Sequence, residues 1–458
     1  MPTSTQETAI EKLSGFIASE EKKRLFLLKG YAGTGKTSIV GVLVKILPQI
    51  GVDTYLMAPT GRAAKVLAAY SGHPAYTIHK GIYHVGDDES GFYITLRENK
   101  RKNTVFIVDE ASMIAGDTAG KHELFPASNL LDDLLTYVYS GENCSLVMVG
   151  DTAQLPPVGT EISPAFNENL LSKSFFLNIT SCELTEVVRQ EETSGILANA
   201  THIRKIIHAP KFRKDFFETA SYKDVIRISG TELEDALNTA YSAAGDTESI
   251  VICRSNKRAN LYNNEIRKRL LFREGTINSG DKIMIVKNNY YWLSKKSKAG
   301  FIANGDIAEI LRIRKLEQIN DVFSFADATI RLVDYPEEKD IDVKLLLNTL
   351  SSELPSLPNS EFRNLFHAIS ENYSHIPEKN KRLKQIYNDP YINALQIKFA
   401  YAMTCHKTQG GQWQNVFVEQ GYLTDEMVNR EYLRWLYTAI TRATGKLFLV
   451  NFHDRFYR

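Results

Sequence analysis

The chain has 458 residues, of which 43% are hydrophobic, 24% charged and 10% aromatic. At roughly 100 to 200 residues per domain this length predicts two to four domains, and the composition excludes disorder as the dominant state. The formal net charge is +1, so a polyanionic partner must be bound by a local basic patch.

The cysteine content excludes a disulfide framework and a metal cluster. Cys144, Cys182, Cys253 and Cys405 lie too far apart in sequence for a CxxC pair or a zinc knuckle. We therefore expect a reducing, cytoplasmic environment. The N-terminus has no signal-peptide pattern, and no run of about 18 apolar residues occurs, so we expect neither export nor a membrane span.

Helical segments alternate with short apolar runs from residue 6 to 175, which predicts the parallel sheet of an α/β domain. The predicted strands are 24–30, 53–60, 103–110 and 143–151. Because ligands bind beyond the carboxyl ends of such strands, the residues that follow them are candidate site residues.

The rest of the chain predicts two insertions and a second α/β domain. Residues 83–102 contain two β-like runs around a turn-rich DDESG, which predicts a hairpin. A second α/β pattern includes strands at 249–255, 415–419 and 446–451 and a helix at 256–271. The predicted domains are 1–82 with 103–177, the hairpin 83–102, 178–275 with 393–458, and a strand-rich and partly helical insertion at 276–392.

The strongest motif is GYAGTGKT, which fits the P-loop pattern between an apolar strand and a helix. Its glycines let backbone N–H groups surround phosphates, Lys36 reaches the β and γ phosphates, and the Thr37 hydroxyl can bind Mg²⁺. This placement disfavours a chance glycine-rich turn. The residues predicted to bind ATP here are Gly30, Ala32, Gly33, Thr34, Gly35, Lys36, Thr37 and Ser38.

A pair of carboxylates, Asp109 and Glu110, ends the third predicted strand in VFIVDEASM. Asp109 is suited to hold Mg²⁺ through water, and Glu110 is suited to take a proton from the attacking water. The alternative, a helix cap at the strand end, is weaker beside a P-loop. The fourth strand is followed by GDTAQLPPVG, where Gln154 can bridge the γ phosphate and a second domain.

In this order the motifs resemble those of superfamily 1 helicases, and six further segments extend the resemblance over nearly the whole chain. HKTQG and GDTAQLPPV are similar to the B branch, which includes RecD-like and Dda-like helicases. The segments are APTGRAAKVL (58–67), TIHKGI (77–82), LTEVVRQ (184–190), GDKIMIVKNN (280–289) with FIANGD (301–306), AMTCHKTQGGQWQNVFV (402–418) and LYTAITRA (436–443).

The resemblance implies a fold and an activity. The fold is α/β, with two RecA-like P-loop motor domains, a small β-hairpin insertion and a β-rich, barrel-like insertion. The activity is ATP-driven unwinding of DNA with 5′ to 3′ translocation on single strands, by a monomer that binds single-stranded and tailed duplex DNA. Alternatives are an RNA or RNA–DNA hybrid helicase, an ATPase that displaces proteins from DNA, and a P-loop ATPase that acts on protein substrates.

The resemblance also assigns roles in the ATP site. Gln6 matches the glutamine that reads adenine, although it could be an ordinary polar residue of the first helix. Arg189 and Arg442 match two arginines that approach the γ phosphate from the second motor domain. Tyr31 departs from the proline that is commoner in this family, and we assign it no role.

The resemblance implies nucleic-acid contacts mainly from three of these segments, 58–67, 77–82 and 402–418. Bound strands need phosphate ligands and aromatic faces for stacking. Taken singly, a threonine or histidine in a loop is more often a cap or a solvated residue. Trp292 lies among lysines in KNNYYWLSKKSK, and Phe92 lies in the hairpin that matches the duplex-splitting pin, but ordinary cross-strand packing explains both aromatics equally well. The other predicted contacts are Pro59, Thr60, Arg62, Thr77, His79, Thr404, His406 and Lys407.

Overall fold

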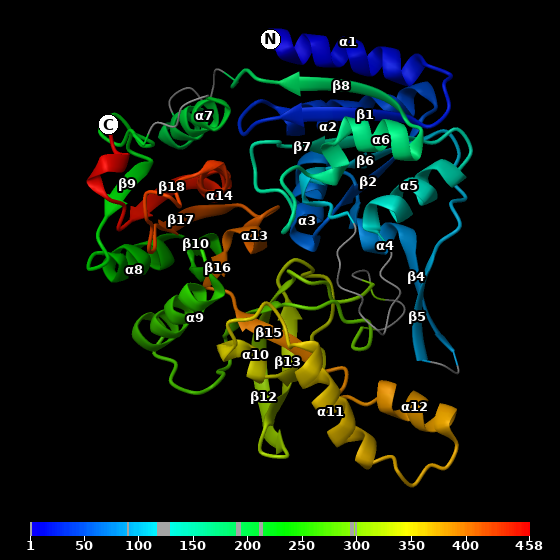
Figure 1. The fold of residues 1–458 in the computed structure, drawn as a ribbon, viewed down its shortest axis with the longest axis vertical. Helices are drawn as coiled ribbons and strands as arrows, with labels where there is room; N and C mark the ends of the chain where they lie inside the picture. Colours follow the sequence, from blue (N-terminus) through cyan, green and yellow to red (C-terminus); the bar gives the residue numbers. More distant parts are fainter. Residues whose placement is uncertain are drawn as a thin grey trace.

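The computed structural model describes residues 2–88, 91–116, 129–188, 194–209, 214–293, 297 and 300–458. Its described part contains a six-stranded sheet, a five-stranded sheet, a closed five-stranded barrel and a two-stranded hairpin. The two sheets lie side by side, and the barrel lies below them in the view of Figure 1. The mixed α/β class and the barrel-like insertion agree with the prediction.

The first sheet is parallel and has the strand order β3-β2-β6-β7-β1-β8. Leu25 and Leu27 face one helical layer, whereas Phe26 and Leu28 face the other, as the period of two in a strand requires. Each strand is a short apolar run because helices bury both faces. The strands are β1 Arg24–Gly30, β2 Asp53–Ala58, β3 Ala75–Thr77, β6 Thr104–Val108, β7 Ser145–Gly150 and β8 Asn178–Leu184.

Helices cover both faces of this sheet. One layer contributes Ala9, Val40 and Leu67, and the opposite layer contributes Ile78 and Leu134. The helices are α1 Ser4–Ala18, α2 Lys36–Ile46, α3 Gly61–Ser71, α4 Ile78–Ile82, α5 Leu130–Ser140 and α6 Glu168–Phe175, with short 3₁₀ turns at Leu47–Ile50, Ala111–Met113 and Pro164–Phe166.

Strand β8 corrects the predicted boundary between the two α/β units. The prediction assigns residues from 178 onward to the second unit, but β8 pairs in parallel with β1 and forms an edge of the first sheet. Periodicity identifies a strand without identifying its partner, which explains the error.

The second sheet is also parallel, with the order β16-β10-β17-β18-β9. The predicted helix at 256–271 is α-helical only to Glu265 and continues as a π-helical turn over Ile266–Leu270. The strands are β9 Val225–Ile228, β10 Ser249–Cys253, β16 Ala402–Thr404, β17 Trp413–Glu419 and β18 Ala443–Val450. The helices are α7 Gly195–His208, α8 Leu233–Ala244, α9 Asn256–Glu265, α13 Cys405–Thr408 and α14 Arg430–Ile440, with 3₁₀ turns at Asp246–Glu248 and Asp454–Phe456.

The barrel interrupts the second α/β unit. It extends to Phe399, beyond the predicted boundary at 392, because its last strand pairs with both β11 and β14. Three helices accompany it, and Leu365 and Ile386 pack against Phe325 of the barrel. The elements are β11 Lys282–Ile285, β12 Ile307–Ile319, β13 Phe323–Leu332, β14 Ile341–Leu346, β15 Leu395–Phe399, α10 Asn348–Ser351, α11 Asn359–Glu371 and α12 Lys379–Tyr387.

The predicted hairpin is present as antiparallel strands β4 Tyr83–Asp88 and β5 Gly91–Leu96. It projects from the first unit toward α12, and α12 lies against β5 (Figure 1). The side chains of residues 85–94, including that of Phe92, lie outside the described part. None of the described helices has the length and apolar character needed to cross a membrane.

Candidate functional site

The P-loop lies between the end of β1 and the start of α2. Gly33 and Gly35 have φ values of +72° and +83°, a left-handed conformation that glycine adopts without strain. A Cβ on Gly35 would also lie 2.3 Å from Gln6 Nε2. Lys36 Nζ donates to the carbonyls of Gly30 and Tyr31 at 2.8 Å each, which holds its ammonium inside the loop. Thr37 and Ser38 are exposed on the first turn of α2.

Gln6 lies beside this loop. Its side-chain oxygen accepts the Thr3 N–H at 3.0 Å as part of a capping box at the start of α1. Its amide nitrogen donates to the Thr34 carbonyl at 3.0 Å. The structure therefore brings Gln6 to the predicted nucleotide site, and the cap fixes the direction of its amide.

The two carboxylates that follow β6 are held in different ways. Asp109 Oδ1 accepts the Glu110 N–H at 2.8 Å, and its Oδ2 accepts the Tyr70 hydroxyl at 2.6 Å. Glu110 has φ +51°, a left-handed conformation that is strained for a residue with a Cβ. Sequence reasoning missed Tyr70, because a tyrosine on an amphipathic helix has the pattern of a core residue.

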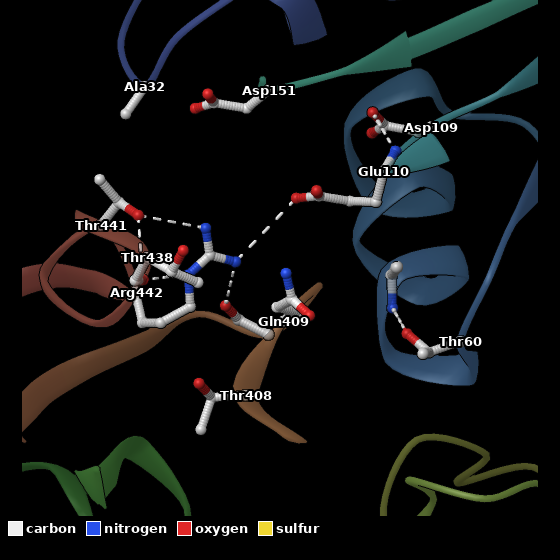
Figure 2. Close-up of polar contacts among 12 residues, drawn as sticks. Ala32, Thr60, Asp109, Glu110, Asp151, Thr408, Gln409, Thr438, Thr441 and Arg442 are labelled. Atoms are coloured by element: carbon white, nitrogen blue, oxygen red, sulfur yellow. Dashed lines mark hydrogen bonds and ion pairs between the residues drawn. The ribbon is translucent and has the colours of Figure 1, made fainter. Parts of the chain in front are cut away.

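Arg442 extends from the end of α14 toward Glu110 (Figure 2). One guanidinium nitrogen lies 4.0 Å from Glu110 Oε1, although the two residues belong to different sheets. Burial raises the pKa of Glu110, and the charges of Arg442 and Lys36 oppose this rise. The structure thus brings the predicted base and the predicted arginine to one place.

The guanidinium of Arg442 is fixed by its own unit. It donates to the Thr438 carbonyl at 3.1 Å, the Gly411 carbonyl at 3.3 Å and the Thr441 hydroxyl at 3.3 Å, and the residue is only 4% exposed. These bonds hold the planar group in one orientation (Figure 2). Arg189, the second predicted arginine, lies outside the described residues.

Further contacts join the two units around this site. The Tyr437 hydroxyl donates to Asp151 Oδ2 at 2.6 Å and accepts the Ala32 N–H of the P-loop at 2.9 Å. The Leu155 N–H donates to the Thr438 hydroxyl at 2.8 Å, and Gln409 donates to the Leu155 carbonyl at 2.8 Å. Sequence reasoning had missed Tyr437, Asp151 and Gln409.

Gln154 lies inside this interface between the units. It is 6% exposed, and its side-chain oxygen has no hydrogen-bond partner among the residues that the structure describes. A buried amide oxygen in this state is free to accept a bond from a ligand or from water.

The predicted nucleic-acid residues of the first unit have intramolecular partners. The Thr60 and Thr77 hydroxyls cap α3 and α4 by accepting the N–H groups of Ala63 and Lys80, each at 3.2 Å. Arg62 does not point to an open groove, because it donates to the Gln412 carbonyl at 3.0 Å and stacks 3.9 Å from the Trp413 ring centroid. Pro59 is half-buried directly after β2.

The barrel turn at 301–306 lies between the other predicted contacts. His79 packs against Phe301, and burial lowers its pKa to about 4. Lys407 donates to Asn304 Oδ1 at 2.7 Å, and burial lowers its pKa to about 8. The barrel turn therefore contacts a residue of each unit, His79 of the first and Lys407 of the second.

The remaining contacts of this set differ in their surroundings. Thr404 is half-buried at the start of α13, and burial lowers the pKa of His406. Trp292 packs on the barrel core and donates to the Asn393 carbonyl at 2.7 Å, as expected for ordinary hairpin packing.

Two family models match the two halves of the chain. The model of an AAA domain matches residues 3–209, and the model of a UvrD-like helicase C-terminal domain matches residues 399–450. Together they include more than half of the chain, and they contain the P-loop, the paired carboxylates and Arg442.

The chain is also similar to curated helicases and to solved structures. It is 25% identical to the ATP-dependent DNA helicase dda of Enterobacteria phage T4, over 94% of this chain and 96% of that protein. It is 33% identical to the ATP-dependent RecD2 DNA helicase of Deinococcus radiodurans, over 33% of this chain and 18% of that protein. A structure of the Bacteroides Pif1 helicase with ADP-AlF3 and ssDNA superposes with a TM-score of 0.48, at 16% identity over 100% of this chain and 94% of that one.

The site geometry, the two family models and the relatives lead to one assignment. The chain is similar to the superfamily 1B helicases, in the branch of the RecD-like and Dda-like proteins.

Proposed function

We propose that this protein is an ATP-driven DNA helicase that moves 5′ to 3′ along single-stranded DNA and unwinds duplexes. The observation that carries this proposal is the distance of 4.0 Å between Arg442 and Glu110. The first unit provides Glu110 and the second unit provides Arg442, so the site needs both units. The printed name of the full-length relative dda, an ATP-dependent DNA helicase, supports the same substrate. The polarity rests on the resemblance alone.

In this proposal ATP binds in the P-loop. The left-handed glycines Gly33 and Gly35 fit this role, because they turn backbone N–H groups toward the phosphates at the start of α2. Lys36 supplies a cation, and Gln6 is placed to contact the base. The side chains of Thr37 and Asp109 offer the hydroxyl and carboxylate oxygens that Mg²⁺ prefers. When bound, Mg²⁺ neutralises phosphate charge during the reaction.

The chain's own residues then carry out hydrolysis. Glu110 accepts a proton from the attacking water, which requires its ionised form. Arg442 and Lys36 stabilise the negative charge that develops on the transferred phosphoryl group, and we assign Arg189 the same role. Gln154, with its unpartnered buried oxygen, is placed to orient the water or to report the γ phosphate to the second unit.

Movement follows from the position of the site between two units. We propose that the unit of the six-stranded sheet and the unit of the five-stranded sheet are RecA-like motor domains that close and open in each ATP cycle. The strand would pass along Thr60, His79 and Lys407, the predicted contacts from the two units. The β4–β5 hairpin, with Phe92, would separate the duplex.

A strand-displacement assay tests this function directly. The protein is mixed with matched duplexes that carry a 5′ or a 3′ single-stranded tail, in ATP and Mg²⁺. We expect displacement from the 5′-tailed DNA only. Displacement from the 3′-tailed DNA would overturn the polarity, and activity confined to RNA tails would identify an RNA helicase. ATP turnover that is indifferent to nucleic acid would overturn the proposal as a whole.

Arg442→Ala tests whether the second unit completes the ATP site. We expect DNA-stimulated turnover to fall by at least roughly tenfold, because arginines of this type contribute on the order of 10³ or more. Arg455→Ala is the control, since Arg455 is a partly exposed arginine of the same unit that pairs with Asp425. Normal turnover in Arg442→Ala would show that the first unit hydrolyses ATP without the second, and it would contradict the two-unit site.

A further inference from the structure

Tyr31, the second residue of the P-loop, has its side chain in the seam between the two units. It is 7% exposed and belongs to the hydrophobic core of the second sheet, although its backbone continues β1 of the first. Its hydroxyl donates to Glu183 Oε1 at 2.6 Å. The Arg204 guanidinium carbon of α7 lies 4.2 Å from its ring centroid, which is a cation–π contact.

The backbone of the same residue belongs to the phosphate-binding loop. The Tyr31 carbonyl accepts bonds from Lys36 Nζ and the Thr34 hydroxyl, each at 2.8 Å. The next N–H, that of Ala32, donates to the Tyr437 hydroxyl of α14 at 2.9 Å. The segment of Tyr31 and Ala32 is therefore hydrogen-bonded to Lys36, the predicted phosphate ligand, and to α14 of the second unit, and its aromatic ring contacts α7 of that unit.

We propose that Tyr31 is a positioning residue that couples the P-loop to α7 of the second unit. This inference rests on the proposed helicase function, in which the two units move relative to each other. A displacement of α7 changes the contact between Arg204 and the Tyr31 ring. The ring then moves the backbone carbonyl that holds Lys36. The position of the second unit relative to the P-loop therefore alters the affinity of the loop for nucleotide.

The chemistry of the contact suits a coupling element. The hydroxyl of Tyr31 bonds to a carboxylate of β8, in its own unit, and its ring stacks on a cation of the other unit. Burial and Glu183 raise the pKa of Tyr31, so the hydroxyl remains a proton donor at neutral pH. The bond to Glu183 fixes the ring in the first unit, so a rotation of α7 changes the distance between the Arg204 guanidinium and that ring.

A tyrosine that only fills the core would behave differently. Its loss would lower the melting temperature and leave the communication between nucleotide and DNA unchanged. Loss of a coupling residue changes the effect of DNA on ATP hydrolysis. We measure this effect as the stimulation factor, which is kcat/KM for ATP with single-stranded DNA divided by kcat/KM for ATP without DNA.

The experiment compares Tyr31→Phe, Arg204→Gln and the double variant with the wild-type protein. Tyr139→Phe is the matched control, because the Tyr139 hydroxyl donates to the Arg24 carbonyl at 2.9 Å, away from the seam. We expect the stimulation factor to fall about fivefold or more in each single variant, mainly through KM, on the scale of typical coupling. The double variant should be no worse than either single one, because the bond to Glu183 orients the ring that Arg204 contacts, so both changes act on that one contact. The control should stay within twofold of wild type.

The outcomes separate this inference from the function on which it rests. A wild-type stimulation factor near one would overturn the helicase function itself. A normal wild-type factor that both single variants retain within twofold would overturn only the role of Tyr31. Melting temperatures are measured for each variant, and if Tyr31→Phe lowers stability, the half-buried Arg204 provides the decisive variant from the other side of the contact.

Discussion

Glu110 combines two features that are rarely found together in a structural residue. Its backbone is left-handed at φ +51°, and its carboxylate is directed at an arginine of another unit. Strain of this kind persists where the surrounding structure holds a functional group in place. A simple helix cap would need neither the strain nor the arginine.

Glu110→Gln should reduce ATP turnover by roughly a hundredfold or more, because a general base contributes 10² to 10⁴. Nucleotide and DNA binding should change little. Burial raises the pKa of Glu110, so the wild-type rate should begin to fall, as pH decreases, at a higher pH than for an ordinary glutamate base. Turnover of Glu110→Gln within threefold of wild type would exclude Glu110 as the base.

Asp306 is a buried carboxyl group in the barrel turn that contacts α3. It is 2% exposed, its Oδ2 accepts the Ala303 N–H at 2.7 Å, and its Oδ1 has no hydrogen-bond partner among the described residues. A Cβ on Gly61 would lie 2.6 Å from this Oδ1, so the barrel and the first unit are in close contact here. Burial raises the pKa of Asp306 to about 7, with a further contribution from Asp334.

The folded protein should therefore lose stability as pH rises from 3.8 to about 7, and the loss should be complete above about 7. Between the ordinary value of 3.8 and about 7 the folded state binds a proton that the unfolded state has released. The loss is on the order of 4 kcal/mol at most for a shift of about three pKa units. Asp306→Asn should raise the melting temperature at pH 8 more than at pH 5. Asp340→Asn, at an exposed ion pair with Arg331, is the control, and equal shifts at both pH values would refute the assignment.

At the scale of elements, periodicity and motifs together predicted most strands, the hairpin and the P-loop. They could not predict that β8 pairs with β1, because a strand's partner is decided by tertiary packing. Tyr70 and Tyr437 escaped notice for a related reason. A tyrosine on an amphipathic helix has the pattern of a core residue, and only the structure reveals that these two hydroxyls bond to groups of the ATP site. Tyr31 was singled out in the sequence, but its contacts with Glu183 and Arg204 depend on tertiary packing.

The β4–β5 hairpin permits a test at this scale. Deleting residues 86–91 shortens the paired strands and leaves their base at Tyr83 and Leu96 intact. We expect strand displacement to be lost while DNA-stimulated ATP turnover and translocation along single strands remain, because no described side chain of the hairpin bonds to a residue of the ATP site. Normal displacement by the deletion variant would show that another element separates the duplex.

At the scale of the whole molecule, buried ion pairs join the barrel to the second unit. Arg267 and Arg273 both pair with Asp281 at the entrance of the barrel, at 2.9 and 3.1 Å. The Tyr401 hydroxyl, at the exit, donates to Asp281 Oδ1 at 3.3 Å and accepts the Lys282 N–H at 2.9 Å. The Asn263 side chain bonds to the exit as well, through the N–H and the carbonyl of Ala402. These contacts join both ends of the barrel segment to the second unit.

Asp281→Ala should be strongly destabilising, because it leaves two buried or half-buried arginines without their shared partner. Breaking a buried pair typically costs about 3–5 kcal/mol. The variant should melt at a lower temperature, and proteases should cut it near the barrel entrance. Asp342→Ala, which removes an exposed pair with Arg314 on the barrel, should have little effect. Equal melting of both variants would contradict this account.

The contact between Asp281 and Tyr401 means that the chain leaves and re-enters the second α/β unit at a single point. About a quarter of the polypeptide lies between these two residues, so the two ends of a long insertion meet at one place in the second unit. The insertion is nevertheless part of the core, because barrel residues such as Ile283 share one hydrophobic cluster with Val251 and Phe417 of the second sheet. A brief turn in its place could join the two ends, but it would expose those apolar side chains to water, so the shortened protein should be less stable than the intact one.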